Sequence, residues 1–266
     1  MNPALGTASM PSLADVREYW EGYARRVLER RNGLADPRAQ IEAQNRDHAE
    51  AYGLANRLLE HHGVAGTSVL ELGCGLGYDT VWLAGSGARV VAIDLSQMCL
   101  EWTRTHLSWH GLEARLQVGN AESLDFSDAS FDIVTARGLL MFTPNPQAAL
   151  DEAWRVLRPG GRIQAIVHHR HSWYVWLAAL GHSRLIDPVD DPRPNRLYSR
   201  GDVRALFRRF MDVTITPDRL PTIPSRRPGL GPSLYNALVV PLARRVPRRL
   251  ASSVGFYLIV EARKPN

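Results

Sequence analysis

Short apolar runs alternate with segments of helical periodicity between residues 68 and 169, and this alternation limits the possible folds more than any other feature of the chain. The predicted strands there are SVLELG, ARVVAIDLS, ARLQVGN, SFDIVTA and GRIQAIVHH, and helical patterns lie among them at 78–84, 97–110 and 148–157. Strands joined by helical crossovers form parallel sheets whose two faces are covered. The pattern therefore predicts a doubly wound α/β fold.

Two more predicted strands, 211–216 and 254–264, complete a mostly parallel, Rossmann-like sheet of seven strands. Helical patterns at 13–31 and 39–62 precede the sheet, so we divide the chain into an N-terminal helical cap, 1–62, and a Rossmann-like core, 63–266. Insertions interrupt the core at about 170–198, which contains the aromatic helix pattern HSWYVWLAALGHS, and at 217–253, between the last two strands. Such insertions often hold a substrate pocket.

The cysteines and the N-terminus indicate a reduced, cytoplasmic protein. Cys74 and Cys99 cannot form a disulfide framework, and they lack the spacing of a zinc site. No metal site is predicted. The first residues show no basic start followed by a sustained apolar run, and no stretch has the length of a membrane span.

The sequence VLELGCGLGYDT places three glycines, Gly73, Gly75 and Gly77, directly after the first strand. Glycines at this turn let a ligand lie against the backbone, and the second strand ends in Asp94, where a carboxylate can accept hydrogen bonds from a ribose. The last glycine of the dinucleotide fingerprint is replaced by Tyr78. The combination predicts a nucleoside ligand that lacks a pyrophosphate.

Four motifs in order, VLELGCGLG, VVAIDLS, GNAESLDFSDASFDIV and ALDEAWRVLRPGG, make residues 67–168 resemble the class I S-adenosylmethionine-dependent methyltransferases, in particular the small-molecule, type 11-like kind. The resemblance implies an enzyme that uses S-adenosyl-L-methionine to methylate a small molecule, such as a secondary metabolite or a lipid-like acceptor. The acceptor atom stays open between oxygen, nitrogen and carbon. By position, the resemblance implies these cofactor-binding residues: Glu71, Gly73, Gly75, Gly77, Asp94, Leu95, Met98, Asn120, Ala121, Glu122 and Arg137.

Within that resemblance the glycines would line the methionine half of the cofactor, and Glu71 would order their loop. Asp94 would hold the ribose, and Met98 would pack against the adenine. Asn120 stands where the family more often has aspartate, but its carbonyl can still accept from the adenine amino group. Arg137 is unusual near the methyl-transfer point, and it could instead meet the cofactor carboxylate or an anionic substrate.

The end of the fifth strand, IVHHRHSW, supplies the candidate general base. Histidine is the side chain that titrates near neutral pH, and alternation along a strand keeps His168 and His169 from facing the same side. We predict that His168 is the catalytic base and treat His169 as a candidate substrate contact, although alternation would turn it toward a covering helix. The N-terminal sequence REYWEGYARR resembles the cap segment of related methyltransferases, where aromatic residues close over the cofactor. Tyr19 and Tyr23 in it are four residues apart and would share one helix face, so we treat them as candidate substrate contacts.

The sequence leaves other functions open. The net charge of +5 is concentrated in 217–253, which has seven arginines and one aspartate. A basic surface suits nucleic acid or a membrane surface, but the tetrad typical of base-amine methyltransferases is absent after the fourth strand, so nucleic acid is disfavoured. Pro241 and Pro247 would break this segment into short helical pieces. A protein that binds the cofactor without methylation, a cyclase for example, remains an alternative, and the oligomeric state is open.

Overall fold

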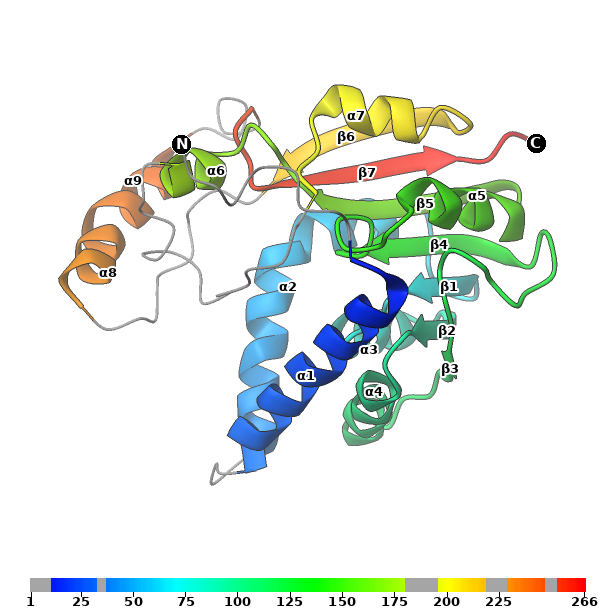
Figure 1. The fold of residues 1–266 in the computed structure, drawn as a ribbon, viewed down its shortest axis with the longest axis horizontal. Coiled ribbons are helices and arrows are strands. Elements are labelled where there is room, and N and C mark those ends of the chain that lie inside the picture. The colour runs from blue at the N-terminus through cyan, green and yellow to red at the C-terminus, as the bar shows by residue number, and fades with distance from the viewer. Residues whose placement is uncertain (1–10, 33–36, 180–195, 219–228, 247–252) are drawn as a thin grey trace.

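A seven-stranded sheet forms the centre of the computed structural model, which describes residues 11–32, 37–179, 196–218, 229–246 and 253–266 (Figure 1). The strand order is β3-β2-β1-β4-β5-β7-β6. Neighbouring strands from β3 to β5 are parallel, whereas β7 runs antiparallel to both β5 and β6. This confirms the predicted Rossmann-like fold. The strands are β1 (Ser68–Leu72), β2 (Arg89–Asp94), β3 (Arg115–Val118), β4 (Phe131–Arg137), β5 (Leu157–His168), β6 (Met211–Asp218) and β7 (Tyr257–Arg263).

Helices cover both faces of the sheet and extend beyond one end of it (Figure 1). Two long helices, α1 and α2, precede β1, and α8, a π-helical turn called η3, and α9 lie in the insertion between β6 and β7. The helices are α1 (Leu13–Asn32), α2 (Pro37–His61), α3 (Tyr78–Gly85), α4 (Gln97–Trp109), α5 (Pro146–Val156), α6 (Trp173–Ala179), α7 (Arg200–Leu206), α8 (Leu230–Leu234), η3 (Tyr235–Val239) and α9 (Val240–Arg245).

Alternation along the strands divides the core between the two faces. On β5, Ile163, Ala165 and Val167 pack with α5 and α7, whereas Ile166 faces Ala55 of α2. The second face continues under α3 and α4 as a smaller apolar cluster. Because both faces are buried, the central strands are mostly apolar, which is why the sequence pattern identified them.

The largest differences from the predicted elements lie between β4 and β5. Strand β5 begins at Leu157, four residues before the predicted start, because Leu157 pairs with Phe131 ahead of an irregularity in the ladder. Helix α5 begins at Pro146, where the Asn145 side chain accepts from the amide of Ala148 at 3.1 Å. Proline at the first helical position needs no donor, so it starts the helix instead of breaking it.

The insertion between β6 and β7 is helical from Leu230 to Arg245 without a break. The sequence predicted that Pro241 would break the helix, and this prediction is wrong. The chain takes π winding over Tyr235–Val239, just before the proline, and returns to α winding at Val240. A proline lacks the amide that an α-helix would need there, and the wider turn accommodates this. Pro247 lies outside the described residues, as do residues 180–183 of the predicted aromatic helix, of which α6 is the described part.

Within the described parts of the chain, none of the helices combines the length and the apolar character needed to cross a membrane. The same residues contain no cluster of three histidine, cysteine, aspartate or glutamate side chains suited to a metal ion.

Candidate cofactor and substrate site

A cavity of about 350 Å³ opens where the parallel strands end, at the carboxyl edge of the sheet. Its volume is within the range of small-ligand pockets, and its place is the one where doubly wound folds bind ligands. The sheet side of the cavity is lined by residues that follow β1, β2, β3 and β4, and the opposite side by α1 and α2. Ten of the residues predicted from sequence line it: Tyr19, Tyr23, Gly73, Gly75, Asp94, Leu95, Asn120, Ala121, Arg137 and His168.

The glycine loop forms the floor of the cavity. The amides of Gly73 and Cys74 both donate to the carbonyl of Ile93, which ties the loop to the end of β2. A β-carbon added at Gly75 would meet nothing within 4 Å, so it would project into open space. Gly75 also has a φ of +54°, in the left-handed region that favours glycine. The bare backbone therefore leaves room for a ligand.

Asp94 stands at the end of β2, beside this loop. Its Oδ2 accepts from the amide of Gly75 and its Oδ1 from the amide of Ser96, both at 2.9 Å. Burial raises the pKa of Asp94, and the amides that it accepts oppose that rise. A carboxylate offers about four acceptor sites, so two amides leave it able to accept from ribose hydroxyls as well.

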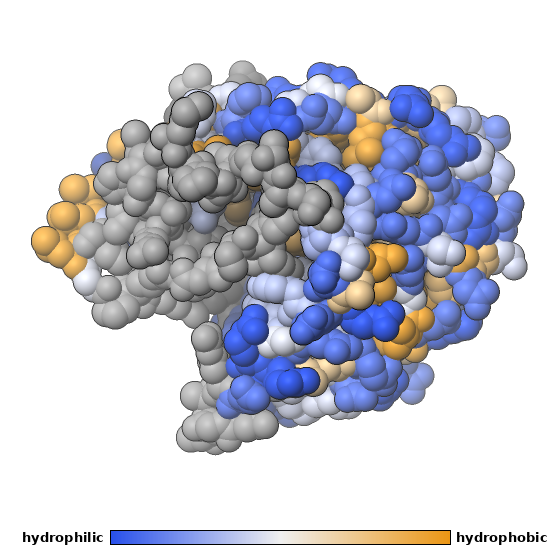
Figure 2. Space-filling view, in the orientation of Figure 1, coloured by the Kyte–Doolittle hydropathy of each residue, from blue (hydrophilic) through white to orange (hydrophobic). Residues whose placement is uncertain are grey.

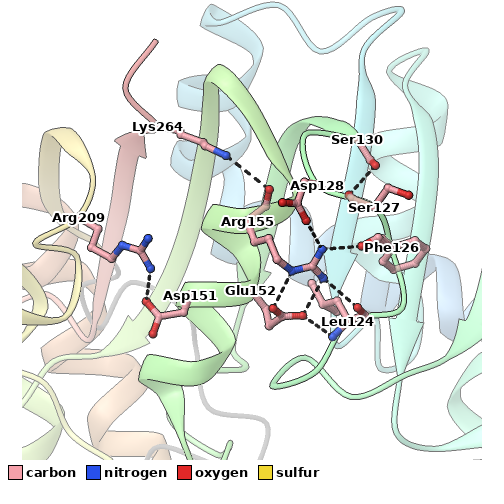
Figure 3. Close-up of polar contacts among 10 residues, drawn as sticks. All are labelled: Leu124, Phe126, Ser127, Asp128, Ser130, Asp151, Glu152, Arg155, Arg209 and Lys264. Carbon is pink, nitrogen blue, oxygen red and sulfur yellow. Dashed lines mark hydrogen bonds and ion pairs between the residues drawn. The ribbon is translucent and has the colours of Figure 1, made fainter.

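The loop after β3 brings Asn120 and Ala121 to the cavity, and a network behind the loop fixes it (Figure 3). Arg155 of α5 donates to the carbonyls of Leu124 and Phe126, at 2.9 and 2.7 Å. Glu152 accepts from the amide of Leu124 at 2.6 Å and pairs with Arg155. These contacts hold the part of the loop that contains Leu124 and Phe126, while Asn120 and Ala121 line the cavity.

Five predicted residues do not line the cavity: Glu71, Gly77, Met98, Glu122 and His169. Each of them either holds a loop that flanks the cavity or packs in another part of the structure. A β-carbon at Gly77 would come within 2.8 Å of Thr103, so this glycine allows α3 to approach α4. Met98 packs beside Ala24 of α1 and Leu76 of the glycine loop, whereas its neighbour Cys99 lines the cavity.

Glu122 and Glu71 serve the loops that flank the cavity. Glu122 accepts from the hydroxyl of Thr143 and from the amide of Asn145, at 2.6 and 2.8 Å. Glu71 accepts from the hydroxyl of Thr80 at 2.6 Å, which links β1 to α3 across the glycine loop. That contact is the kind of loop ordering expected for Glu71 from the sequence.

Arg137 lines the cavity, but its guanidinium is engaged by protein groups. It donates to Asp79 of α3 and to Asn56 of α2, each at 2.6 Å, and to Gln164 of β5 at 2.6 and 2.9 Å. The side chain is only 2% exposed. Burial alone would raise the pKa of Asp79, but the charge of Arg137 holds it below its ordinary value, with help from His48. The pair thus binds α2 and α3 to the sheet rather than presenting a free cation.

His48 of α2 is a cavity residue that sequence reasoning missed. Its Nε2 lies 3.2 Å from Asp79, and its ring stacks on Tyr52 and Tyr78 at centroid distances of 4.3 and 5.1 Å. Tyr52 also lines the cavity. The signal was present, because His48 and Tyr52 are four residues apart on one helix, the same spacing that drew attention to Tyr19 and Tyr23.

The far wall of the cavity is aromatic. Trp20 contacts Tyr19, Tyr23 and Phe142 edge to face, with ring centroids 5.5 to 5.6 Å apart. Phe142 follows β4, so these contacts join α1 to the core. Phe142 carried no local signal in the sequence, since the aromatic residue that it contacts in the wall, Trp20, is far away along the chain. The wall offers ring faces and edges to an apolar ligand.

The two histidines at the end of β5 face opposite sides, as alternation predicts. His168 lines the cavity, and its ring stacks on Phe256 at 4.6 Å. His169 is buried, and its Nδ1 lies 3.1 Å from the carbonyl of Gly255. Burial lowers the pKa of His169. The substrate contact considered for His169 has no counterpart among the cavity residues.

The buried side chain of Glu71 should make the stability of the protein depend on pH. Burial raises its pKa to about 8, from an ordinary value of 4.5, and the nearby charge of Asp79 adds to the rise. The folded state therefore takes up a proton that the unfolded chain lacks between about pH 4.5 and about pH 8, and the free energy of unfolding should fall as pH rises through that window. Glu71→Gln cannot ionise, so the variant should gain stability relative to the wild type as the pH rises. Urea unfolding of both proteins across the window measures this.

The matched control is Glu113→Gln, at an exposed glutamate outside the cavity. Its stability difference from the wild type should stay constant across the same pH values. A constant difference for Glu71→Gln as well would show that Glu71 is ionised in the folded protein.

The doubly wound sheet with a ligand cavity at its carboxyl edge defines a Rossmann-like binding domain, and comparisons with known proteins identify its kind. Residues 70–165 match the family described as "Methyltransferase domain". Residues 70–165 of the chain are therefore similar to a methyltransferase domain.

Relatives and solved structures agree with this family. The chain is 33% identical over 141 residues to the ubiquinone biosynthesis O-methyltransferase of Azoarcus sp. strain BH72, covering 53% of this chain and 60% of that protein. It is 43% identical over 102 residues to the demethylmenaquinone methyltransferase of Clavibacter sepedonicus, covering 38% of this chain and 40% of that one. The matched region thus spans 60% or less of these relatives' length.

Among solved structures, the magnesium protoporphyrin IX methyltransferase of Synechocystis PCC 6803, with bound SAH, has a TM-score of 0.59 at 14% identity, over 94% of this chain and 98% of that one. The cyclase SpnF has a TM-score of 0.56 at 18% identity, over 98% of both chains. At these identities the likeness concerns the fold. Since one of these proteins is a methyltransferase and the other a cyclase, the fold alone does not determine the reaction.

The cavity fits S-adenosylmethionine, the cofactor of this class. Added β-carbons at Gly75 and at Gly138, which also lines the cavity, would meet nothing within 4 Å, so both positions leave space for a ligand. Asp94 offers the acceptor that a ribose needs. Of the lining residues that the structure describes, Arg137 alone has a permanent positive charge, and Asp79 neutralises it. Such a donor set suits a nucleoside without a diphosphate.

Proposed function

We propose that this protein transfers the methyl group of S-adenosylmethionine to an apolar small molecule. The observation that supports this most is the composition of the cavity, which joins the glycine loop and Asp94 on one side to the rings of Trp20 and Phe142 on the other. A cofactor and an apolar acceptor could thus meet in one water-poor space. The names of the relatives, which concern quinone biosynthesis, point to ring-containing acceptors of the same character.

For the cofactor half we propose roles that follow from these positions. Gly73 and Gly75 lie against the methionine part, and Asp94 accepts from the ribose. Asn120 accepts from the adenine amino group, with Ala121 and Leu95 beside the ring. Four further residues act without touching the cofactor, by holding the loops that line the cavity: Glu71, Gly77, Met98 and Glu122. Arg137 acts by anchoring α2 and α3 to the sheet.

For the chemistry, bound S-adenosylmethionine supplies an electrophilic methyl group. Methyl transfer is an in-line displacement, so the protein chiefly has to align the acceptor and exclude water. Tyr19, Trp20 and Tyr23 of α1 would cover the acceptor, and His168 would accept a proton where the acceptor has one to lose. The two buried, unpaired cysteines are consistent with a protein of the reducing cytoplasm.

Calorimetry tests the cofactor and mass spectrometry the reaction. S-adenosylhomocysteine should bind, and NADH should not, because the loop lacks the pyrophosphate fingerprint. Phenolic and hydroquinone acceptors, incubated with S-adenosylmethionine and the protein, should gain the mass of one methylene group, whereas oligonucleotides should not. Cofactor binding without any methylated product or S-adenosylhomocysteine formation would favour the non-methylating alternative. NADH binding with no response to S-adenosylhomocysteine would overturn the assignment.

Asp94→Ala should weaken S-adenosylhomocysteine binding by about tenfold to 100-fold. A hydrogen bond to a charged acceptor contributes about 1.5–3 kcal/mol, and each 1.4 kcal/mol is a factor of ten in affinity. Isothermal titration measures the dissociation constant. Asp125→Ala, at an exposed aspartate outside the cavity lining, is the control and should bind like the wild type. A folded Asp94→Ala protein with wild-type affinity would place the ribose elsewhere.

A further inference from the structure

The helical insertion between β6 and β7 presents an apolar face to solvent. Four leucines spaced four residues apart lie on it, and residues at that spacing share a helix face. Their exposed fractions are 79% for Leu230, 49% for Leu234, 65% for Leu238 and 66% for Leu242. We call these four residues the leucine stripe. In Figure 2 an orange cluster occupies the left edge of the molecule, where Figure 1 shows α8 and α9.

The opposite side of the same helical run is held by the protein. Tyr235, Val240 and Ala243 are buried, with exposed fractions of 3% to 7%. The helix is therefore fixed along one side, while the leucine stripe on the other side is exposed. Contiguous exposed leucines are uncommon on a water-facing surface, and they mark a place where something binds.

The charge of the segment indicates what binds there. From residue 219 to residue 253 the sequence has seven arginines and no aspartate, glutamate or lysine. Arg245, the last residue of α9, is exposed. An anionic lipid surface combines an apolar interior for leucines with a uniform negative charge for arginines, and each basic residue near such a surface contributes about 1 kcal/mol. A protein partner would need a face that is both apolar and acidic throughout.

We propose that the leucine stripe docks the protein on the surface of an anionic membrane. Helices α8 and α9 lie at the end of the molecule toward which β1 and β4 point, which is also the edge where the cavity opens (Figure 1). Docking there brings the carboxyl edge of the sheet to the bilayer side. The proposal is independent of methyl transfer, because it rests on a surface that shares no residue with the cavity lining.

Vesicle co-sedimentation of the full chain tests the proposal. The wild type should bind vesicles of phosphatidylcholine with phosphatidylglycerol and should not bind phosphatidylcholine alone. The double variant Leu238→Asp, Leu242→Asp should lose at least about tenfold in partitioning, because two apolar side chains no longer leave water. Met211→Asp, at an exposed methionine on β6 outside this insertion, is the matched control and should bind like the wild type.

Each outcome of this experiment either supports membrane docking or contradicts it. Binding that needs anionic lipid and falls in the leucine variant alone supports membrane docking. Absence of wild-type binding to either vesicle, or equal binding by wild type and leucine variant, overturns it. A dimer in solution that the leucine variant dissolves, with no vesicle binding, would make the stripe an interface between two copies. Titration of the same samples with S-adenosylhomocysteine confirms their folding and keeps this result separate from the cofactor assignment.

Discussion

Replacing Arg137 with methionine should lower the free energy of unfolding by about 3–5 kcal/mol, because it leaves the carboxylate of Asp79 buried without its partner. The pair is only 2% and 13% exposed at its two side chains, and Arg137 also satisfies Asn56 and Gln164. His48 can compensate Asp79 in part, since it is the second group in contact with that carboxylate. Urea unfolding monitored by circular dichroism gives the difference.

A matched control at a more exposed ion pair distinguishes the effect of burial from the effect of losing an arginine. Arg158→Met removes an arginine from its pair with Asp132, whose side chains are 44% and 33% exposed, and it should cost no more than about 1 kcal/mol. Adding Asp79→Leu to Arg137→Met should recover much of the loss, because no buried charge then remains. If Arg137→Met costs no more than Arg158→Met, the buried pair does not secure α2 and α3 to the sheet.

His168→Ala should lower turnover by about 10²- to 10⁴-fold once an acceptor is known, and leave the affinity for S-adenosylhomocysteine almost unchanged. His168 lies in the cavity, and a general base acts only in the transition state. The pH profile of kcat should lose the limb that reports the base. Steady-state kinetics with calorimetry in parallel measures both effects.

His169→Ala is the neighbouring control. Its ring is buried against the carbonyl of Gly255, so its loss should reduce stability and leave the turnover of the folded protein near that of the wild type. Equal, small losses in both variants with an unchanged pH profile would make His168 a lining residue, and alignment alone would be the catalytic principle.

Local patterns were sufficient for the sheet and for the side of the cavity that the glycine loop and Asp94 form. The strands from Ser68 to His168 alternate with helices, and glycines follow the first strand at a turn whose φ values require them. Asp94 ends the second strand, and parallel strands end at one edge, so these residues had to come together. Each of these inferences depends on neighbours in sequence, which is why they could be made without coordinates.

Contacts between segments that are distant in the sequence could not be predicted from local patterns. Arg137 was a candidate ligand of the cofactor by its position, but Asn56, Asp79 and Gln164 from three other elements engage it. Cys99 rather than Met98 lines the cavity, because the first turn of α4 determines which side chain faces inward. A rotation of one residue on a helix turns a side chain by about 100°, and no local pattern specifies it.

The sequence by itself determined the α/β fold, the order of its strands along the chain and the loop that would hold a nucleoside, because periodicity and glycine conformations are local properties. Only the tertiary structure decided what closes the cavity and what faces outward. Trp20, His48 and Phe142 meet there from separate elements, and the leucine stripe is exposed because Tyr235 and Val240 on the other side of the helix are buried. Apolar residues read alike in a sequence whether they face a core or solvent, and packing alone separates the two.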